Sequence, residues 1–159
     1  MLFQAFVTYV RPLLEFNCQV WSPSYSMLVN KIECAQRKFT KRLRGLSIHT
    51  YTERLHSFGA DSLELRRLKL DVVMLDNIIH SNVDVDLAMF HIIDSDLVRS
   101  CGHPLRVVKS HCRINARLYS FVPCNINIWN SLPERLVKCG TVQTFRRHLD
   151  RIELTKFIA

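Results

Sequence analysis

Residues 9–44 decide the fold of this chain and read YVRPLLEFNCQVWSPSYSMLVNKIECAQRKFTKRLR. In the second half of this stretch, apolar residues recur every three or four positions, which is the period of an amphipathic α-helix. These residues are Leu28, Ile32, Ala35, Phe39 and Leu43. The spacing predicts one apolar stripe that packs against the rest of the molecule.

The same predicted helix carries a high density of positive charge. Between positions 31 and 44, Glu33 is the only acidic residue among six basic ones. The six are Lys31, Arg37, Lys38, Lys41, Arg42 and Arg44. This imbalance indicates either a solvated helix surface or a contact surface for a polyanion such as nucleic acid.

The whole chain has the composition of a globular protein with an anionic partner. Its 159 residues are enough for one domain with a core, and 48% of them are apolar. The formal net charge is +8, which favours binding to anions. The apolar runs are too short to span a membrane, and the first residues lack the pattern of a secretory signal. We therefore expect an intracellular protein, cytoplasmic or nuclear, that is not secreted and makes no membrane contact.

Capping signals predict two further helices. Thr50 and Glu53 have the spacing of a capping box, and Gly59 suits the left-handed position that ends a helix, so a short helix is expected over 51–58. Residues 61–64 repeat the cap signature and open a longer helix. The apolar stripe of this longer helix is Leu65, Leu68, Val72, Leu75 and Ile79.

The two ends of the chain also carry helix signals. Residues 2–9 form a short helix that Pro12 is expected to stop. Thr141 caps a last helix, whose apolar stripe is Val142, Phe145, Leu149 and Ile152.

Together these elements predict a mainly α protein. A helical bundle is expected over residues 1–82, and an irregular C-terminal extension over 83–159 packs on it. Within the extension, residues 102–113 are interpreted as a basic loop or a short β-hairpin.

Four more basic residues complete the set expected to contact nucleic acid. Arg66 and Arg67 lie in the first half of the helix that begins near residue 61, outside its apolar stripe. Arg106 and Lys109 lie in the basic loop.

The same loop region holds four potential zinc ligands, which are Cys101, His103, His111 and Cys112. One residue separates the first pair and none separates the second, a spacing that does not match a zinc finger or ribbon. The six cysteines of the chain form no CxxC pair, so free thiols and no bound zinc are expected. The acidic residues between 84 and 96 lack the glycine and closing glutamate of an EF-hand and are interpreted as a polar loop.

Two aromatic residues near the end of the chain allow two interpretations. Trp129 is interpreted as a core anchor, with Pro133 breaking the chain after it. The alternative is that Trp129 or Tyr119 stacks on a nucleic-acid base.

Five short sequence words, in order, carry a resemblance to a known family. They are Tyr-Val-Arg-Pro-Leu-Leu-Glu-Phe at 9–16, Val-Trp-Ser-Pro at 20–23, Ile-Glu-x-x-Gln-Arg-x-Phe-Thr at 32–40, Ser-Leu-Glu-x-Arg-Arg at 62–67 and Trp-Asn-x-Leu-Pro at 129–133. This order resembles the region after the polymerase core in reverse transcriptases of non-LTR retrotransposons, jockey-like ones especially. One position departs from the pattern, because Cys124 stands where the family often has Arg after Ser-Phe-x-Pro.

The resemblance implies a role without catalysis. It makes the chain the thumb and post-thumb part of an RNA-directed DNA polymerase, and hence a fragment of a longer polyprotein. The expected partners are RNA or an RNA–DNA duplex and the upstream polymerase domain, with no small-molecule substrate. No catalytic residue is expected here, because the chain has no Asp-Asp pair. The resemblance places that pair, with its Mg²⁺ ions, in the upstream palm.

Two alternatives remain open. The chain is either a non-enzymatic helical interaction domain that docks an acidic protein, or a degenerate retroelement remnant that has kept no activity. An independent enzyme has no support in the sequence, because neither a GxxxxGK loop nor a GxGxxG loop occurs.

Overall fold

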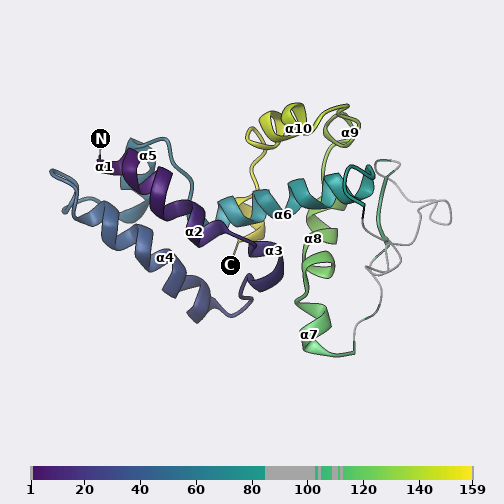
Figure 1. Ribbon diagram of the computed structural model, residues 1–159, viewed down its shortest axis with the longest axis horizontal. Helices are drawn as coiled ribbons and strands as arrows, with labels where there is room; N and C mark the ends of the chain where they lie inside the picture. The colour runs from purple at the N-terminus through teal and green to yellow at the C-terminus, as the bar shows by residue number, and fades with distance from the viewer. Residues whose placement is uncertain (1, 85–102, 104, 109–110, 112, 159) are drawn as a thin grey trace. The chain divides into compact units, whose positions relative to one another are not determined.

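The computed structural model describes residues 2–84, 103, 105–108, 111 and 113–158 (Figure 1). Within these residues every regular element is helical and none is a strand, which confirms the prediction of a mainly α protein. The predicted loop or hairpin at 102–113 lies partly outside them. None of the helices in the described ranges is both long enough and apolar enough to cross a membrane.

The chain divides into two compact units. The first comprises Met1–Leu68 together with Ile158–Ala159, and the second comprises Lys69–Phe157. The division falls inside helix α6 (Leu63–Ile79), whereas the sequence led us to place it after residue 82.

The first unit opens with a helical segment that continues through Pro12. Helix α1 (Leu2–Ala5), a π-helical turn η1 (Phe6–Val10) and helix α2 (Arg11–Glu15) follow one another directly. The prediction that Pro12 stops the helix is therefore wrong. Proline cannot donate the backbone hydrogen bond of a helix interior, and a widened π turn immediately before it changes the bonding register where that donor is missing.

Aromatic stacking holds this segment against two other helices. Phe6 stacks on Phe39 of α4 (Ser26–Lys41), with ring centroids 4.5 Å apart. Phe3 stacks on Phe58, at the end of α5 (Tyr51–Ser57), at 4.1 Å. A short helix α3 (Cys18–Trp21) connects the opening segment to α4.

The predicted capping of α5 is confirmed at both ends. Thr50 Oγ1 accepts from the Glu53 amide at 3.4 Å, and Glu53 Oε2 accepts from the Thr50 amide at 2.8 Å. Gly59 has a φ of +56°, a backbone conformation that favours glycine. Its amide bonds the His56 carbonyl at 3.0 Å, which closes the helix.

The cap of helix α6 lies one residue later than predicted. Ser62, rather than Asp61, accepts from the Leu65 amide at 3.2 Å. Of the predicted stripe, Val72 and Leu75 are buried, whereas the other three residues are half-buried. The buried apolar residues that the sequence did not single out are Leu63, Val73 and Ile78.

The second unit contains more helix than the irregular extension we expected. After the part of α6 that it includes come α7 (Asn115–Leu118), α8 (Phe121–Asn130), α9 (Glu134–Val137), α10 (Val142–Leu149) and a 3₁₀ turn η4 (Thr155–Phe157). Thr141 caps α10 as predicted, accepting from the Thr144 amide at 3.3 Å.

Trp129 is a core residue of the second unit, as interpreted from the sequence. Its side chain is fully buried, 6.2 Å from the ring of buried Phe145. Its Nε1 donates to the Leu105 carbonyl at 2.7 Å. Asn130 adds a clamp on Val107, accepting from its amide at 3.0 Å and donating to its carbonyl at 2.8 Å. The Trp-Asn word thus fixes a chain segment more than twenty residues away.

Candidate nucleic-acid interface

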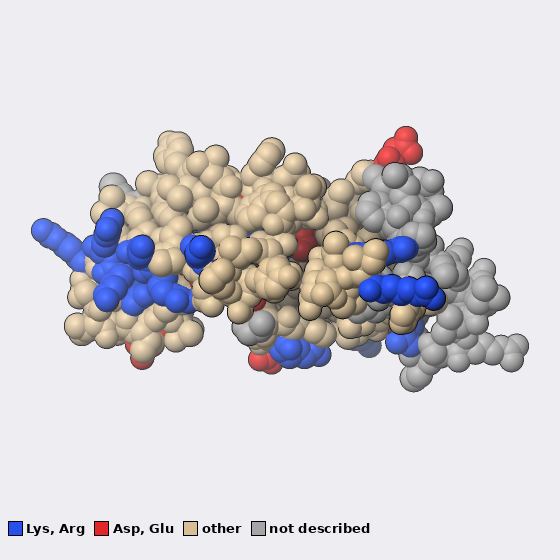
Figure 2. Space-filling model, turned by 90° about the horizontal axis from the view of Figure 1, so that it is seen from below, with Lys and Arg blue, Asp and Glu red and all other residues tan. Residues whose placement is uncertain are grey.

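The candidate interface is the outer side of α4 together with the residues just after it. All six basic residues predicted there are exposed: Lys31, Arg37, Lys38, Lys41, Arg42 and Arg44. We call this set the α4 cationic surface. Figure 2 shows Lys and Arg gathered on this part of the first unit.

The inner side of α4 is polar, contrary to the predicted apolar stripe. Its buried residues are Glu33, Gln36 and Thr40. Of the predicted stripe, Leu28 is exposed and the other four residues are half-buried. The reason is that hydrogen-bond donors from three other segments converge on this side of the helix, and buried donors require acceptors.

Glu33 explains why the outer side of α4 carries no negative charge. Its carboxylate accepts from the amides of Leu63 and Glu64, at 3.2 Å each, and from the Tyr51 hydroxyl. A carboxylate at the first turn of a helix satisfies free amides and interacts favourably with the helix dipole. The one acidic residue between 16 and 52 therefore caps α6 instead of opposing the cations.

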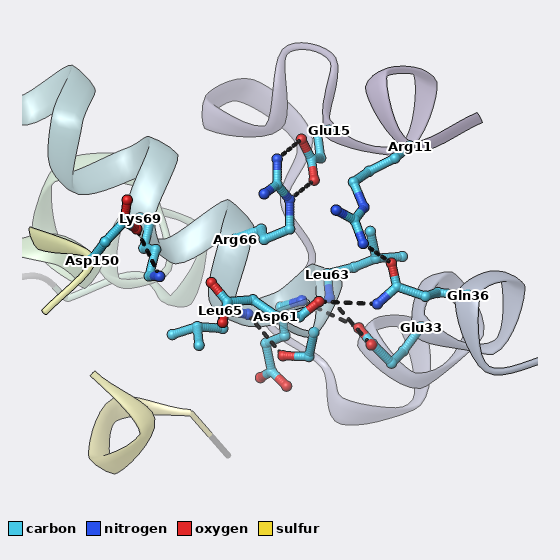
Figure 3. A network of polar contacts seen from close by, with 12 residues as sticks. Arg11, Glu15, Glu33, Gln36, Asp61, Leu63, Leu65, Arg66, Lys69 and Asp150 are labelled. Carbon is cyan, nitrogen blue, oxygen red and sulfur yellow. Dashed lines mark hydrogen bonds and ion pairs between the residues drawn. The ribbon is translucent and has the colours of Figure 1, made fainter. Parts of the chain in front are cut away.

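Gln36 joins α4 to three further segments (Figure 3). Its Oε1 accepts from Arg11 Nη2 at 3.0 Å. Its Nε2 donates to the Asp61 carbonyl at 3.0 Å and to the Tyr51 hydroxyl at 3.1 Å. Burial, followed by the hydrogen bond to Glu33, raises the pKa of Tyr51, so the phenol remains a donor at neutral pH.

Arg54 fixes the C-terminal end of α4 and the segment that follows it. This residue is buried, and its Nε donates to Thr40 Oγ1 at 3.2 Å. Other guanidinium nitrogens donate to the carbonyls of Arg37 (3.5 Å) and His49. A cation at the C-terminus of a helix satisfies carbonyls that lack helical partners.

Arg66 and Arg67 differ from the other predicted contacts of the first unit. Arg66 is engaged by both carboxylate oxygens of Glu15, one of them at 3.0 Å (Figure 3). Arg67 is only 2% exposed and lies over the ring of Trp21 at 6.0 Å. We leave both out of the candidate interface, because neither offers a free charge at the surface.

The remaining predicted residues belong to the second unit. Arg106 is half-buried, and Lys109 lies outside the described residues. Of the candidate zinc ligands, Cys101 and Cys112 also lie outside them. His111 is exposed, whereas His103 is buried with its Nε2 3.1 Å from the Trp129 carbonyl. Burial lowers the pKa of His103.

Across the part of the chain that the structure describes, no three His, Cys, Asp or Glu side chains form a group that could hold a metal ion. The prediction of free thiols without zinc stays a prediction.

Sequence reasoning missed the residues that support the interface. We assigned no structural role to Gln36, Thr40 or Arg54 from the sequence. One signal pointed to the first two, since both belong to the Gln-Arg-x-Phe-Thr word at 36–40.

Comparison with protein-family models, with curated proteins and with solved structures gave no match to this chain.

Proposed function

We propose that this chain binds nucleic acid without catalysing a reaction, as the C-terminal part of a retrotransposon RNA-directed DNA polymerase. The α4 cationic surface grips the phosphate backbone of a template–primer duplex or of element RNA. The observation that carries the proposal is the separation of charge on α4. Four exposed cations lie on α4 and two just after it, while the helix's one carboxylate is buried as a cap.

A rigid backbone supports this role. Hydrogen bonds with Arg11, Tyr51, Arg54 and the Asp61 carbonyl fix the inner side of α4. A surface held in this way keeps its cations positioned before binding, which reduces the entropy lost on contact. Lys and Arg at phosphates set position rather than sequence, so binding is independent of sequence.

The identity of the parent rests on the resemblance of the five sequence words. In an intact element the upstream polymerase domain would supply the Asp-Asp pair and its Mg²⁺ ions.

The test is the salt dependence of binding to a short RNA–DNA duplex of arbitrary sequence. If about four of the six cations engage phosphates, the log–log slope of affinity against salt is roughly −3 to −4, at about −0.9 per neutralised phosphate. Changing Arg37, Lys38, Lys41 and Arg42 together to Gln removes most of that slope.

A matched control carries the same change in net charge elsewhere. Arg113, Arg117, Arg146 and Arg147 are exposed residues of the second unit, and their change to Gln leaves the slope nearly unaltered. A folded α4 variant with an unchanged slope rejects the α4 surface and leaves the basic loop around Arg106 as the next candidate.

A second candidate function is a helical interaction domain that docks a protein partner. It is favoured by exposed apolar side chains on the opening helical segment and just after it. Tyr9 is 74% exposed, Leu13 75% and Phe16 73%, and exposed apolar surface can mark protein interaction sites. Salt dependence separates the two candidates, because apolar docking does not release counterions.

A further inference from the structure

The segment between α4 and α5 is mostly exposed to solvent, and two of its residues, Arg42 and Arg44, belong to the α4 cationic surface. Residues 42–50 form turns without regular structure. Ser47 is exposed, and Ile48 is 88% exposed. Gly45 has a φ of +79°, and a Cβ placed there would meet no atom within 4 Å.

The sequence places arginine three residues before a hydroxyl residue at four positions. The acceptors are Thr40, Ser47, Ser57 and Ser120, after Arg37, Arg44, Arg54 and Arg117. Ser47 alone has a second arginine five residues before it, Arg42. The residue directly after it, Ile48, is apolar, as are the residues after Ser57 and Ser120. Basic residues at fixed distances before a hydroxyl are a charge pattern by which protein kinases select substrates.

The structure separates Ser47 from the other three hydroxyls. Thr40 is fully buried, and its hydroxyl donates to the Gln36 carbonyl at 2.9 Å. The hydroxyl of Ser57 donates to the carbonyl of Arg54, a buried arginine, at 2.8 Å. Ser120 precedes α8, and its hydroxyl donates to the Arg117 carbonyl at 2.7 Å.

Ser57 and Ser120 are exposed like Ser47, but the hydroxyls of both are engaged in hydrogen bonds. Ser47 differs from them, because its hydroxyl makes no hydrogen bond within the described ranges of the chain. Both Arg42 and Arg44 are exposed, so the carboxylates of a kinase substrate groove can reach them. Extending residues 44–49 requires the bonds from the Leu46 amide to the Leu43 carbonyl (3.2 Å) and from the His49 amide to the Leu46 carbonyl (3.3 Å) to open. The bond from Arg54 to the His49 carbonyl must open as well. Exposed turns open at low cost.

We propose that Ser47 is the acceptor of an arginine-directed Ser/Thr protein kinase, and that its phosphate weakens the grip of the α4 cationic surface on nucleic acid. The second half of this proposal rests on the proposed function; the first half does not.

The modification is an ordinary phosphoryl transfer from Mg-ATP. Ser47 Oγ forms a bond to the γ-phosphorus, the bond from that phosphorus to the β-phosphate oxygen breaks, and ADP leaves. The hydroxyl proton passes to the catalytic aspartate of the kinase.

The effect on binding follows from charge. A phosphoserine carries about −1.5 to −2 at neutral pH. It stands three residues from Arg44 and five from Arg42, and can pair with them in place of a nucleic-acid phosphate. Losing one to two backbone contacts makes the salt slope shallower by roughly one to two and weakens binding at ~0.1 M salt on the order of tenfold or more.

The first experiment incubates the full chain with a purified arginine-directed kinase and radiolabelled Mg-ATP. The expected result is one phosphate per chain, mapped to Ser47 by mass spectrometry. Ser47→Ala abolishes incorporation, whereas the matched variants Ser57→Ala and Ser120→Ala retain it. Arg44→Gln and Arg42→Gln each lower the rate of phosphorylation. Phosphate mapped to Ser57 or Ser120, or none at Ser47, overturns the proposal.

The second experiment compares the phosphorylated and unmodified chains in duplex binding over a salt series. The expected result is a shallower slope and weaker affinity after phosphorylation, with Ser47→Ala unchanged by kinase treatment. Phosphate at Ser47 with unaltered binding overturns the regulatory half. If the unmodified chain binds no duplex at all, the proposed function fails and the regulatory half falls with it, while the phosphate mapping still decides the first half.

Discussion

Two charged residues of opposite sign, Glu33 and Arg54, are buried in the first unit. Glu33 is a carboxylate on a cationic helix, and Arg54 is a cation that is buried. Each is positioned at a helix end whose dipole and free backbone groups suit its sign. Burial of Glu33 leaves the outward side of α4 with one sign of charge.

We expect Glu33→Gln to reduce the free energy of unfolding by about 1–3 kcal/mol, because hydrogen bonds to a charged acceptor are stronger than hydrogen bonds to a neutral one. The salt slope of duplex binding stays unchanged, since no exposed cation is altered. Urea denaturation followed by circular dichroism measures the loss. Glu53→Gln, in the exposed capping box of α5, serves as the control with a smaller loss, and equal losses would contradict the cap role of Glu33.

Asn130 gives a second prediction at this scale. Asn130→Ala removes both bonds to the Val107 backbone, and we expect a loss of about 1–3 kcal/mol because the clamp is half-buried. Asn127 lies on the same helix but is exposed, so Asn127→Ala is the matched control with almost no loss. Protection of the Val107 amide from hydrogen exchange, measured by NMR, should fall in the first variant alone.

At the scale of elements, α4 and α6 differ in what their buried sides contain. The buried side of α4 is polar and is satisfied by hydrogen bonds. The buried side of α6 is mostly apolar but includes Asp76, which is 3% exposed. His80 Nδ1 lies 3.2 Å from the Asp76 carboxylate but bonds the Asp76 backbone carbonyl at 3.0 Å. The buried carboxylate is therefore poorly compensated.

Asp76 makes stability depend on pH. Burial raises the pKa of Asp76 to about 6, and the ion pair with His80 only partly opposes this. The pKa of Asp76 is higher in the folded state than in the unfolded state, so the protonated carboxyl group stabilises the fold. This contribution to the free energy of unfolding is complete below about pH 4 and is lost as the pH rises to about 6.

We expect the unfolding free energy to fall by about 2–3 kcal/mol across that window. The variant Asp76→Asn lacks this fall and is more stable than the parent at pH 7. Chemical denaturation at half-unit pH steps makes the comparison. A parallel pH dependence in parent and variant would show that Asp76 does not titrate in this way.

At the scale of the whole molecule, the proposed nucleic-acid surface belongs to the first unit. The net charge of +8 attracts polyanions, and six exposed cations gather on α4 and the residues just after it. The proposed function assigns catalysis to a separate upstream polymerase domain.

The purified chain is therefore expected not to extend a primer on an RNA template with Mg²⁺ and nucleotides. It has no Asp-Asp pair to hold two metal ions. A primer-extension assay with a complete reverse transcriptase as positive control measures this. Extension by the purified chain that tracks with the protein through gel filtration would refute the assignment as a non-catalytic part.

The sequence by itself determined the helical class, the capped ends of α5 and α10, the core role of Trp129 and the exposed cations of α4. These features depend on signals within a few residues, such as the 3.6-residue period, the Thr50–Glu53 box and the glycine at position 59. The five sequence words gave a proposed family, which the structure does not test.

Only the tertiary structure decided which side of α4 is buried, that Glu33 caps α6 and that Arg67 is inaccessible. It also decided that Thr40, Ser57 and Ser120 have hydrogen-bonded hydroxyls. For α4 and Glu33 the reason is distance along the chain. Glu33 meets the Leu63 amide 30 residues away, and Arg11 meets Gln36 25 residues away. A hydrogen-bond partner so far along the chain leaves no period or spacing in the sequence near either residue. The polar side of α4 is therefore buried because of the partners it meets, against the preference of its own apolar residues.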